Sequence, residues 1–276
     1  MKKYKLTDET REFLGITLHR IVCVTAFANV SAGDLGGWVE SEKNLSQDGD
    51  AWVSGNAWVS GDACVYGDAW VYGNALVYGN ARVYGNARVY GKACVCGNAR
   101  VYGNALVYGD ACVYVDACVS DNARVYGDAR VYGDAWVSGD ACVSGDACVS
   151  GNARVYGNAR VSGDARVSGD ACVYGDARVY GDACVYGNAR VYGKACVSGN
   201  ALVEKTADYI VLKNNWSSGR YFTYTLSNKM WKVGCFYGTC EELVKKAYAD
   251  SKLSGKCYAA SVRYVETLEK IQAEVK

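Results

Sequence analysis

The sequence predicts an all-β solenoid, in which one chain winds through triangular coils and short strands of successive coils stack in parallel. Two residue types set the period. Valine occupies every sixth position from Val53 to Val203, 26 times, and alanine stands two residues before each valine, from Ala51 to Ala201. The chain of 276 residues contains no proline. The absence of proline suits a fold in which nearly every backbone N–H donates to a hydrogen-bond ladder.

Each six-residue unit reads as a short strand, Ala-x-Val-x, followed by a Gly-[Asn/Asp] corner. Residues two apart on a strand share a face, so alanine and valine point inward and the two x positions point outward. Three strands and three corners make a coil of 18 residues, and residue i then lies under residue i+18 at about 4.8 Å, the spacing of paired strands. The 26 units therefore predict about nine coils.

The pattern Val-x-x-[Asn/Asp]-Ala-x resembles the hexapeptide repeat of left-handed β-helix proteins, in which an aliphatic side chain fills the interior of the coil. This resemblance implies a single-stranded left-handed parallel β-helix. The segments LGGWVESEKNLS (35–46) and GCFYGT (234–239) resemble a bacterial and prophage group of such proteins. Members of that group are often loosely labelled transferase-like or polymer-forming.

Both ends of the chain lack the repeat. We expect residues 1–44, with the β-rich run ITLHRIVCVTAF, to form a cap on the first coil of a helix that spans residues 45–208. Residues 209–276 are expected to form a small α+β module, a cap or an oligomerisation and partner-binding element. Its strands are YIVL, RYFTYTLS and MWKVGCFYG.

Two helices are expected at the end of this module. A capping box at Thr239-Cys240-Glu241-Glu242 predicts a helix through about Lys252. A second helix follows, because apolar residues recur on one helical face. These residues are Tyr258, Val262, Val265, Leu268 and Ile271.

The stretch VYVDACVSDNARV is the one irregularity in the corners, since Val115 and Asp121 stand where the other units have glycine. A β-branched residue tolerates positive φ poorly. We therefore expect that the glycine position does not require a left-handed backbone. The Asn or Asp that follows it is the expected left-handed residue instead.

The outward positions are the candidate binding surface. The position after alanine holds arginine ten times and cysteine nine times, and the position after valine holds tyrosine 15 times. Tyrosine, tryptophan and arginine are enriched in protein-binding hot spots, and aromatic residues in register also stabilise a parallel stack. The candidate residues, grouped by the period of 18, are Trp52, Trp70, Tyr72, Tyr90, Tyr108, Tyr126, Arg82 and Arg100.

One corner of the coil carries an acidic row. Neighbouring carboxylates at about 4.8 Å repel by about 0.9 kcal/mol even in bulk water. Arg130 and Arg166 would offset this repulsion, or a row of Ca²⁺ ions would; no other cofactor is expected. The row consists of Asp110, Asp128, Asp146, Asp164 and Asp182.

Catalytic and metal chemistry find little support in the sequence. In the family that the sequence resembles, acyltransferases use a histidine as the base, and the related carbonic anhydrases bind zinc with three histidines. This chain has one histidine, His19, outside the repeats, and the register between residues 51 and 203 leaves no room for a projecting loop. The spacing of Cys235, Cys240, Cys257 and His19 matches no CxxC zinc motif. These observations favour a non-catalytic protein.

We therefore predict a structural or protein-binding scaffold that binds a protein partner or associates with itself. The resemblance further implies that the protein is encoded by a prophage and inhibits host defence. The alternatives are an acyltransferase acting at a subunit interface and a binder of nucleotides or single-stranded nucleic acid. A net charge of +1 argues against nucleic acid, no apolar run is long enough to cross a membrane, and no export signal precedes the 14 cysteines. A cytoplasmic location is expected.

Overall fold

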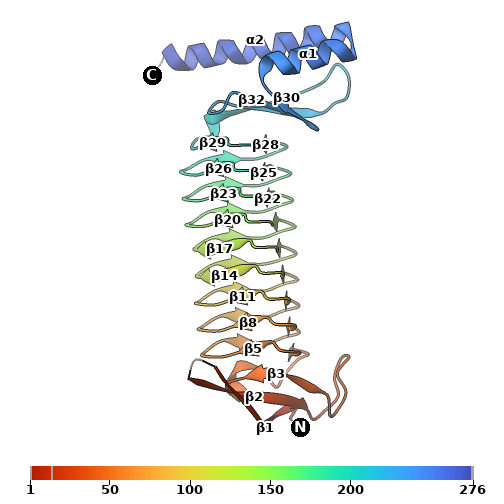
Figure 1. Ribbon diagram of the computed structural model, residues 1–276, viewed down its shortest axis with the longest axis vertical. Helices are drawn as coiled ribbons and strands as arrows, with labels where there is room; N and C mark the ends of the chain where they lie inside the picture. The colour runs from red at the N-terminus through yellow and green to blue at the C-terminus, as the bar shows by residue number, and fades with distance from the viewer. Residues whose placement is uncertain (1, 14, 275–276) are drawn as a thin grey trace.

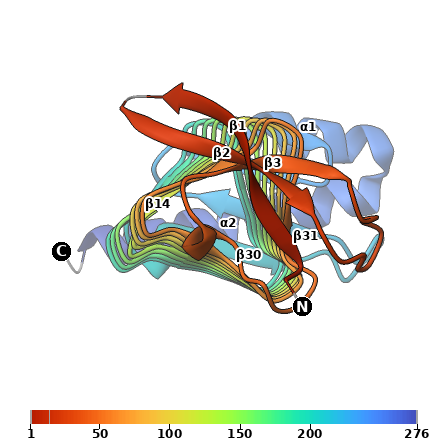
Figure 2. The same ribbon diagram turned by 90° about the horizontal axis from the view of Figure 1, so that it is seen from below.

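A computed structural model describes residues 2–13 and 15–274. The chain forms a rod of about nine stacked coils, with a β-rich cap at the N-terminal end and a sheet with two helices at the other (Figure 1). Seen along the rod, the coils superimpose in a three-sided outline (Figure 2). The predicted solenoid is confirmed.

Each side of the rod is one sheet in which every third strand of the coils pairs in parallel, and the antiparallel strands β1 and β2 of the cap extend one of the three sheets. The 12-stranded sheet contains β1 (Tyr4–Phe13), β2 (Ile16–Cys23), β3 (Leu35–Val39), β5 (Trp58–Val59), β8 (Leu76–Val77), β11 (Cys94–Val95), β14 (Cys112–Val115), β17 (Arg130–Gly133), β20 (Cys148–Val149), β23 (Arg166–Val167), β26 (Cys184–Val185) and β29 (Leu202–Val203). The nine-stranded sheet contains β4 (Trp52–Val53), β7 (Trp70–Val71), β10 (Arg88–Val89), β13 (Leu106–Val107), β16 (Arg124–Val125), β19 (Cys142–Val143), β22 (Arg160–Ser162), β25 (Arg178–Tyr180) and β28 (Cys196–Val197). The eight-stranded sheet contains β6 (Cys64–Val65), β9 (Arg82–Val83), β12 (Arg100–Val101), β15 (Cys118–Val119), β18 (Trp136–Val137), β21 (Arg154–Val155), β24 (Cys172–Val173) and β27 (Arg190–Val191).

The core of the rod consists of the repeated alanines and valines. All of them from Ala51 to Val203 are buried, and the strands pair in register with residues 18 positions away. Backbone N–H groups of each coil donate to carbonyls of the next, as from Arg100 to Ala117 at 2.9 Å. Because each coil pairs with the backbone N–H and C=O groups of its neighbours, only the two ends of the stack need caps.

The expectation for the corners is wrong. The glycines of the repeat have φ of 62° to 76°, and Val115 and Asp121 adopt the same left-handed conformation at 64° and 57°. Among the described residues, no Asn or Asp that follows the glycine position has positive φ. The turn thus places its left-handed residue directly after the strand, and the two non-glycine residues accept that backbone at a cost in strain.

A second constraint acts on the corner glycines. A Cβ atom on Gly145 would lie 3.1 Å from the backbone nitrogen of Gly163 in the next coil. Glycine is therefore favoured both by its positive φ and by the close stacking of the coils. A Cβ on Gly97, one coil below Val115, would lie 2.9 Å from the Val115 backbone nitrogen, and the corner one coil above Val115 is Gly133.

The N-terminal cap closes the first coil with polar side chains as well as strands. The β1–β2 hairpin crosses the end of the coils (Figure 2), and β3 pairs in parallel with β5. Lys3 is buried and donates to the carbonyls of Gly49 and Ala51. In the 3-10 helix η1 (Glu42–Asn44), the buried Asn44 amide donates to the carbonyls of Gly61 and Ala63.

The C-terminal end of the stack is closed by hydroxyl groups. Strands β30 (Tyr209–Lys213), β31 (Tyr221–Thr225), β32 (Met230–Val233) and β33 (Phe236–Gly238) form an antiparallel sheet after the 3-10 helix η2 (Thr206–Asp208). The Cys196 N–H donates to Thr223 Oγ1 at 2.9 Å, and the Leu202 N–H donates to Ser227 Oγ at 2.7 Å. Side chains thus accept the N–H groups for which no further coil exists.

Helices α1 (Cys240–Asp250) and α2 (Lys252–Glu274) cover the other face of this sheet (Figure 1). Thr239 caps α1 and accepts from the Glu242 N–H, as the capping box predicts. On α2 the side chains of Tyr258 and Val265 are buried, whereas Ile271 is 51% exposed because the helix continues past the sheet. None of the helices described is long and apolar enough to cross a membrane.

Candidate functional site

Two parallel rows of outward side chains run along each side of the rod. One row comes from the position after alanine and the other from the position after valine, since both project from the same face of a strand. Where tyrosines occupy successive coils, their rings stack at 4.8 to 5.4 Å with interplanar angles of 15° or less. The stacks are Tyr66–Tyr84–Tyr102, Tyr72–Tyr90–Tyr108–Tyr126, Tyr114–Tyr132 and Tyr156–Tyr174–Tyr192.

The structure divides the predicted binding residues between two sides of the rod. Arg82 and Arg100 pair on the eight-stranded sheet. The remaining candidates lie on the nine-stranded sheet. They are Trp52, Trp70, Tyr72, Tyr90, Tyr108 and Tyr126.

Trp52 does not reach the surface. Its side chain is 2% exposed and packs edge-on against Phe27 and Tyr4 of the cap, with ring centroids 5.5 Å and 6.5 Å away. Trp70 packs partly against the same core. Trp52 therefore anchors the cap, and the tyrosine stack that begins at Tyr72 is the part of this group open to a partner.

A break in the tyrosine row marks the eight-stranded sheet. Read every 18 residues, its row after valine has serine at Ser120 and Ser138, between Tyr102 and Tyr156. Trp136 covers the first serine, and its Nε1–H donates to Ser120 Oγ at 3.1 Å. Two serines in place of large rings leave a hollow at this point of the row. Serine pairs also interrupt the rows on the other two sides, at Ser144–Ser162 and Ser150–Ser168.

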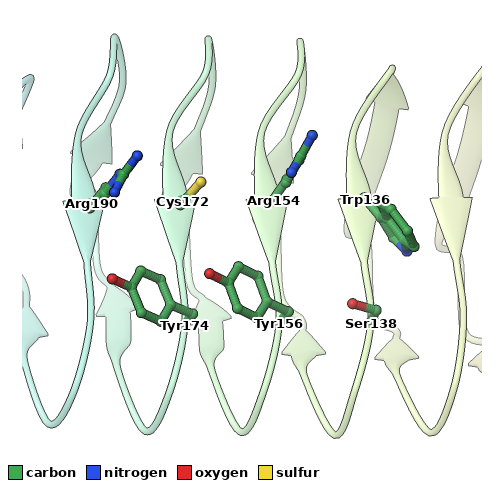
Figure 3. A pocket seen from close by; sticks show the side chains of 7 residues that line it. All are labelled: Trp136, Ser138, Arg154, Tyr156, Cys172, Tyr174 and Arg190. Carbon is green, nitrogen blue, oxygen red and sulfur yellow. The ribbon is translucent and has the colours of Figure 1, made fainter.

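This hollow continues into an open cavity of about 370 Å³ along β18, β21, β24 and β27. Figure 3 shows its two rows of side chains, four from the position after alanine and three from the position after valine. None of its lining residues is among the candidates predicted from the sequence, and the two serines were a weak signal for it because the other two sides of the rod have such pairs too. Its lining consists of Trp136, Ser138, Arg154, Tyr156, Cys172, Tyr174 and Arg190.

The cavity combines exposed aromatic surface with unpaired positive charge. Trp136 is 43% exposed and Tyr156 is 38% exposed. Within the described residues, neither Arg154 nor Arg190 has a carboxylate within ion-pair distance. The nearby Asp170 accepts instead from the Asn152 amide at 2.9 Å. The two guanidinium groups are therefore available to a ligand that carries carboxylates or other anions.

The pKa of Tyr156 is raised by burial of its ring in the stack and, to a lesser extent, by Cys172 and Tyr174. Arg190 and Arg154 act in the opposite direction. The phenol therefore stays protonated at neutral pH and remains a hydrogen-bond donor at the edge of the cavity.

A second cavity, of about 390 Å³, lies where the nine-stranded sheet meets the C-terminal sheet. Four cationic side chains line it together with one carboxylate, that of Asp176. The Lys232 ammonium lies 5.4 Å from the ring of Tyr180. The four cations are Arg160, Arg178, Lys194 and Lys232. This junction has the charge to attract an anion.

The acidic row lies on one corner of the rod as the period of 18 implies. Lys92, one coil before the row, pairs with Asp110 at 3.8 Å. Neither Arg130 nor Arg166 forms an ion pair with the row in the part of the chain that the structure describes. On other corners an asparagine amide donates to the carboxylate of the next coil, as from Asn122 to Asp140 at 3.0 Å.

Other groups that could carry chemistry lie apart. Residues 2–13 and 15–274 bring together no three His, Cys, Asp or Glu side chains that could hold a metal ion. His19 lies on β2 in the cap, paired with Thr10 and Val39. It does not line either cavity described above.

Comparison with known proteins agrees with this architecture. A family model described as the YdcK β-solenoid repeat matches residues 69–83, 81–97, 93–109, 99–114, 117–133, 123–139, 147–161, 153–170, 159–175 and 183–199. One similar protein is the uncharacterised acetyltransferase YdcK of Escherichia coli K12, which is 34% identical over 61 residues. That match covers 19% of this chain and 19% of the E. coli protein.

Proposed function

Since the chain belongs to the hexapeptide-repeat-like β-helix proteins with YdcK-type solenoid repeats, we propose that it is a non-catalytic scaffold that binds a protein partner. The binding surface is the cavity on the eight-stranded sheet. The single observation that carries this proposal is the pairing of exposed Trp136 and Tyr156 with two arginines that lack carboxylate partners among the described residues.

The side chains that line the cavity are held on a rigid backbone. The side chains project from strands whose backbone is hydrogen-bonded on both sides, and the rings of Tyr156 and Tyr174 stack 5.0 Å apart. A partner therefore meets a surface that needs little ordering on binding, which lowers the entropic cost of association. Aromatic rings and arginines then supply the residue types that dominate protein interfaces.

The partner that fits this surface is a protein segment with carboxylates beside apolar side chains. Arg154 and Arg190 flank the cavity and would pair with the carboxylates, while Trp136 and the tyrosine rings would contact the apolar groups. The resemblance to a prophage group supports a more specific version of this proposal. In it, the partner is a host or phage protein, and binding inhibits a host defence.

The test is capture of partners from the native host by the purified full chain and by charge-reversal variants. Arg154→Glu and Arg190→Glu should each lose the partner that the wild type captures. Arg82→Glu, on the same sheet but outside the cavity, is the matched control and should retain it. Point variants are preferable to removal of residues 209–276, because that module caps the N–H groups of the last coil. Equal capture by all three variants would refute the proposed surface.

An acyltransferase is the second candidate, favoured by the name of the E. coli relative. If the chain transferred acyl groups, the purified protein would consume acetyl-CoA and His19→Ala would abolish the activity. Such a result would overturn the non-catalytic proposal, and turnover unaffected by His19→Ala would overturn it too, with another side chain such as a carboxylate as the base.

A binder of nucleotides is the third candidate, favoured by the four cations at the junction of the rod and the C-terminal sheet. Titration with a nucleotide or an oligonucleotide would test this candidate, because stacking of a base on an aromatic ring quenches tryptophan and tyrosine fluorescence. Lys232→Glu should weaken such binding, and Arg82→Glu should not.

A further inference from the structure

A cluster of three thiols interrupts the tyrosine row of the 12-stranded sheet. In that row Cys96 takes the place of a tyrosine, between Tyr78 one coil before and Tyr114 one coil after. Cys94, two residues earlier at the start of β11, pairs in register with Cys112 of the next coil. Among the cysteines of the repeat, these two alone occupy stacked positions in consecutive coils.

The three thiols are free and partly exposed, so a small reagent can reach them. A cysteine is much smaller than the tyrosines on either side of it, and the row therefore has a notch at Cys96. Hydrogen bonds from the Cys94 thiol and the Tyr78 hydroxyl lower the pKa of Cys96 to about 6. Burial raises the pKa of Cys96, but its effect is smaller than that of the hydrogen bond from Cys94. Of the three thiols, Cys96 is thus the one that loses its proton most readily, and thiolates are the nucleophiles of disulfide exchange.

Backbone spacing decides which disulfide the cluster can keep. Paired residues of adjacent strands lie about 4.8 Å apart at Cα, within the roughly 4.4–6.8 Å that disulfides span. Cys94 and Cys112 meet this condition because they pair in register. Residues two apart on one strand lie about 6.6 Å apart, near the upper limit. A Cys94–Cys96 bond would therefore form only in passing, whereas Cys94–Cys112 is the stable product.

We propose that Cys94, Cys96 and Cys112 form a thiol–disulfide exchange site that takes a low-molecular-weight disulfide as its substrate and closes a crosslink between two consecutive coils. The thiolate of Cys96 attacks one sulfur of the substrate, which forms a mixed disulfide and releases the first thiolate. Cys94 then loses its proton and attacks the sulfur of Cys96, and the second thiolate leaves. Cys112 finally attacks Cys94, which restores the Cys96 thiolate.

The reaction balances without any further reagent. The substrate disulfide gains two electrons and two protons and becomes two thiols, while Cys94 and Cys112 lose the same two electrons and two protons. The crosslink is reversible by excess thiol, because in-register Cβ atoms are held slightly further apart than a relaxed disulfide prefers. This inference does not depend on the proposed protein-binding role, since the cluster lies on a different side of the rod.

The experiment treats the reduced full chain with oxidised glutathione and maps disulfides by mass spectrometry without reduction. The wild type should yield the Cys94–Cys112 crosslink. Cys94→Ser should instead stop at a glutathione adduct on Cys96. Cys148 and Cys184 are the matched controls: they lie on the same side, with Arg166 between them in the stack, and should remain reduced.

A second measurement does not rely on variants. At about pH 5.5, alkylation of Cys96 by iodoacetamide should be on the order of tenfold faster than that of a thiol with the ordinary pKa of about 8.5. Two results would overturn the proposal. One is an even spread of glutathione over Cys96, Cys148 and Cys184; the other is formation of the crosslink in Cys96→Ser at the wild-type rate.

Discussion

Val115 pairs in register with Gly133 of the next coil, and the two residues share a left-handed backbone, with φ of 64° and 71°. A β-branched residue in this region is strained, which costs on the order of 1–3 kcal/mol. The corner one coil below is Gly97, where a Cβ would lie 2.9 Å from the Val115 backbone nitrogen, so glycine at that position spares Val115 a further clash.

Replacing Val115 by glycine should therefore stabilise the protein. Relief of the backbone strain outweighs the roughly 0.5–1 kcal/mol of conformational entropy that glycine loses on folding, so we expect a net gain of about 1 kcal/mol. Urea unfolding measures it. Asp121→Gly is the control and should gain less, because the Asp121 carboxylate accepts from the Gly139 N–H at 3.1 Å. A less stable Val115→Gly variant would show that the corner is not strained.

The cost of stacking at a corner can be separated from the cost of positive φ. Gly145 and Gly193 have φ of 67° and 64°, but a Cβ on Gly145 would lie 3.1 Å from the next coil, whereas one on Gly193 would meet nothing within 4 Å. Gly193→Ala should lose about 1 kcal/mol from the backbone conformation alone. Gly145→Ala should lose roughly 1 kcal/mol more, measured by the same unfolding experiment. Equal losses would mean that the coils adjust freely to an added methyl group.

Replacing one aspartate of the acidic row by asparagine should stabilise the protein, because neighbouring carboxylates in the row repel each other. Asp146→Asn removes a charge between Asp128 and Asp164, and its amide would donate to the next carboxylate as Asn122 does to Asp140. We expect a gain of up to about 1 kcal/mol at low ionic strength that shrinks as salt is added.

Calcium provides the opposing test of the same row. If Ca²⁺ ions bind along it, they should raise the melting midpoint of the wild type and raise that of Asp146→Asn less. An unchanged wild-type midpoint with and without Ca²⁺ would reject the cation row.

Alkaline pH should destabilise the C-terminal end of the rod through Tyr209. Burial raises the pKa of Tyr209 to about 12 from its ordinary value of 10. The native state thus holds the proton that the unfolded chain releases above pH 10, so this contribution is complete below pH 10 and is lost as pH rises toward 12. Tyr209→Phe removes the hydroxyl that donates to the Arg190 carbonyl at 2.9 Å. It should cost about 1 kcal/mol at neutral pH and flatten the alkaline decline.

Matched urea titrations of the two proteins between about pH 8 and pH 11 measure this difference. Parallel declines in the wild type and in Tyr209→Phe would assign the alkaline loss to other tyrosines, such as Tyr4 and Tyr180, whose pKa values are also raised by burial.

The corner residues illustrate how far sequence alone carries the structure. Strand positions, coil length and the tyrosine stacks follow from the period of six, because the period of a strand fixes which side chains point inward. The conformation at Val115 did not follow, since the general intolerance of valine for positive φ was applied without knowledge of the left-handed corner that the coils above and below it share. The cavity beside Ser138 depends on the same vertical neighbours, and so does the burial of Trp52 beneath the cap.

The sequence by itself determined the solenoid, its number of coils, its aromatic stacks and the capping box at Thr239, because each depends on a local period or a contact within a few residues. Only the tertiary structure decided which outward residues remain accessible and which hydroxyl groups close the last coil. It also decided that Trp136, Arg154 and Arg190 line one open cavity and that Cys94 and Tyr78 lower the pKa of Cys96. Those features depend on how residues from different coils and from the caps are brought together, and that placement is set by packing at the ends and by the size of each vertical neighbour.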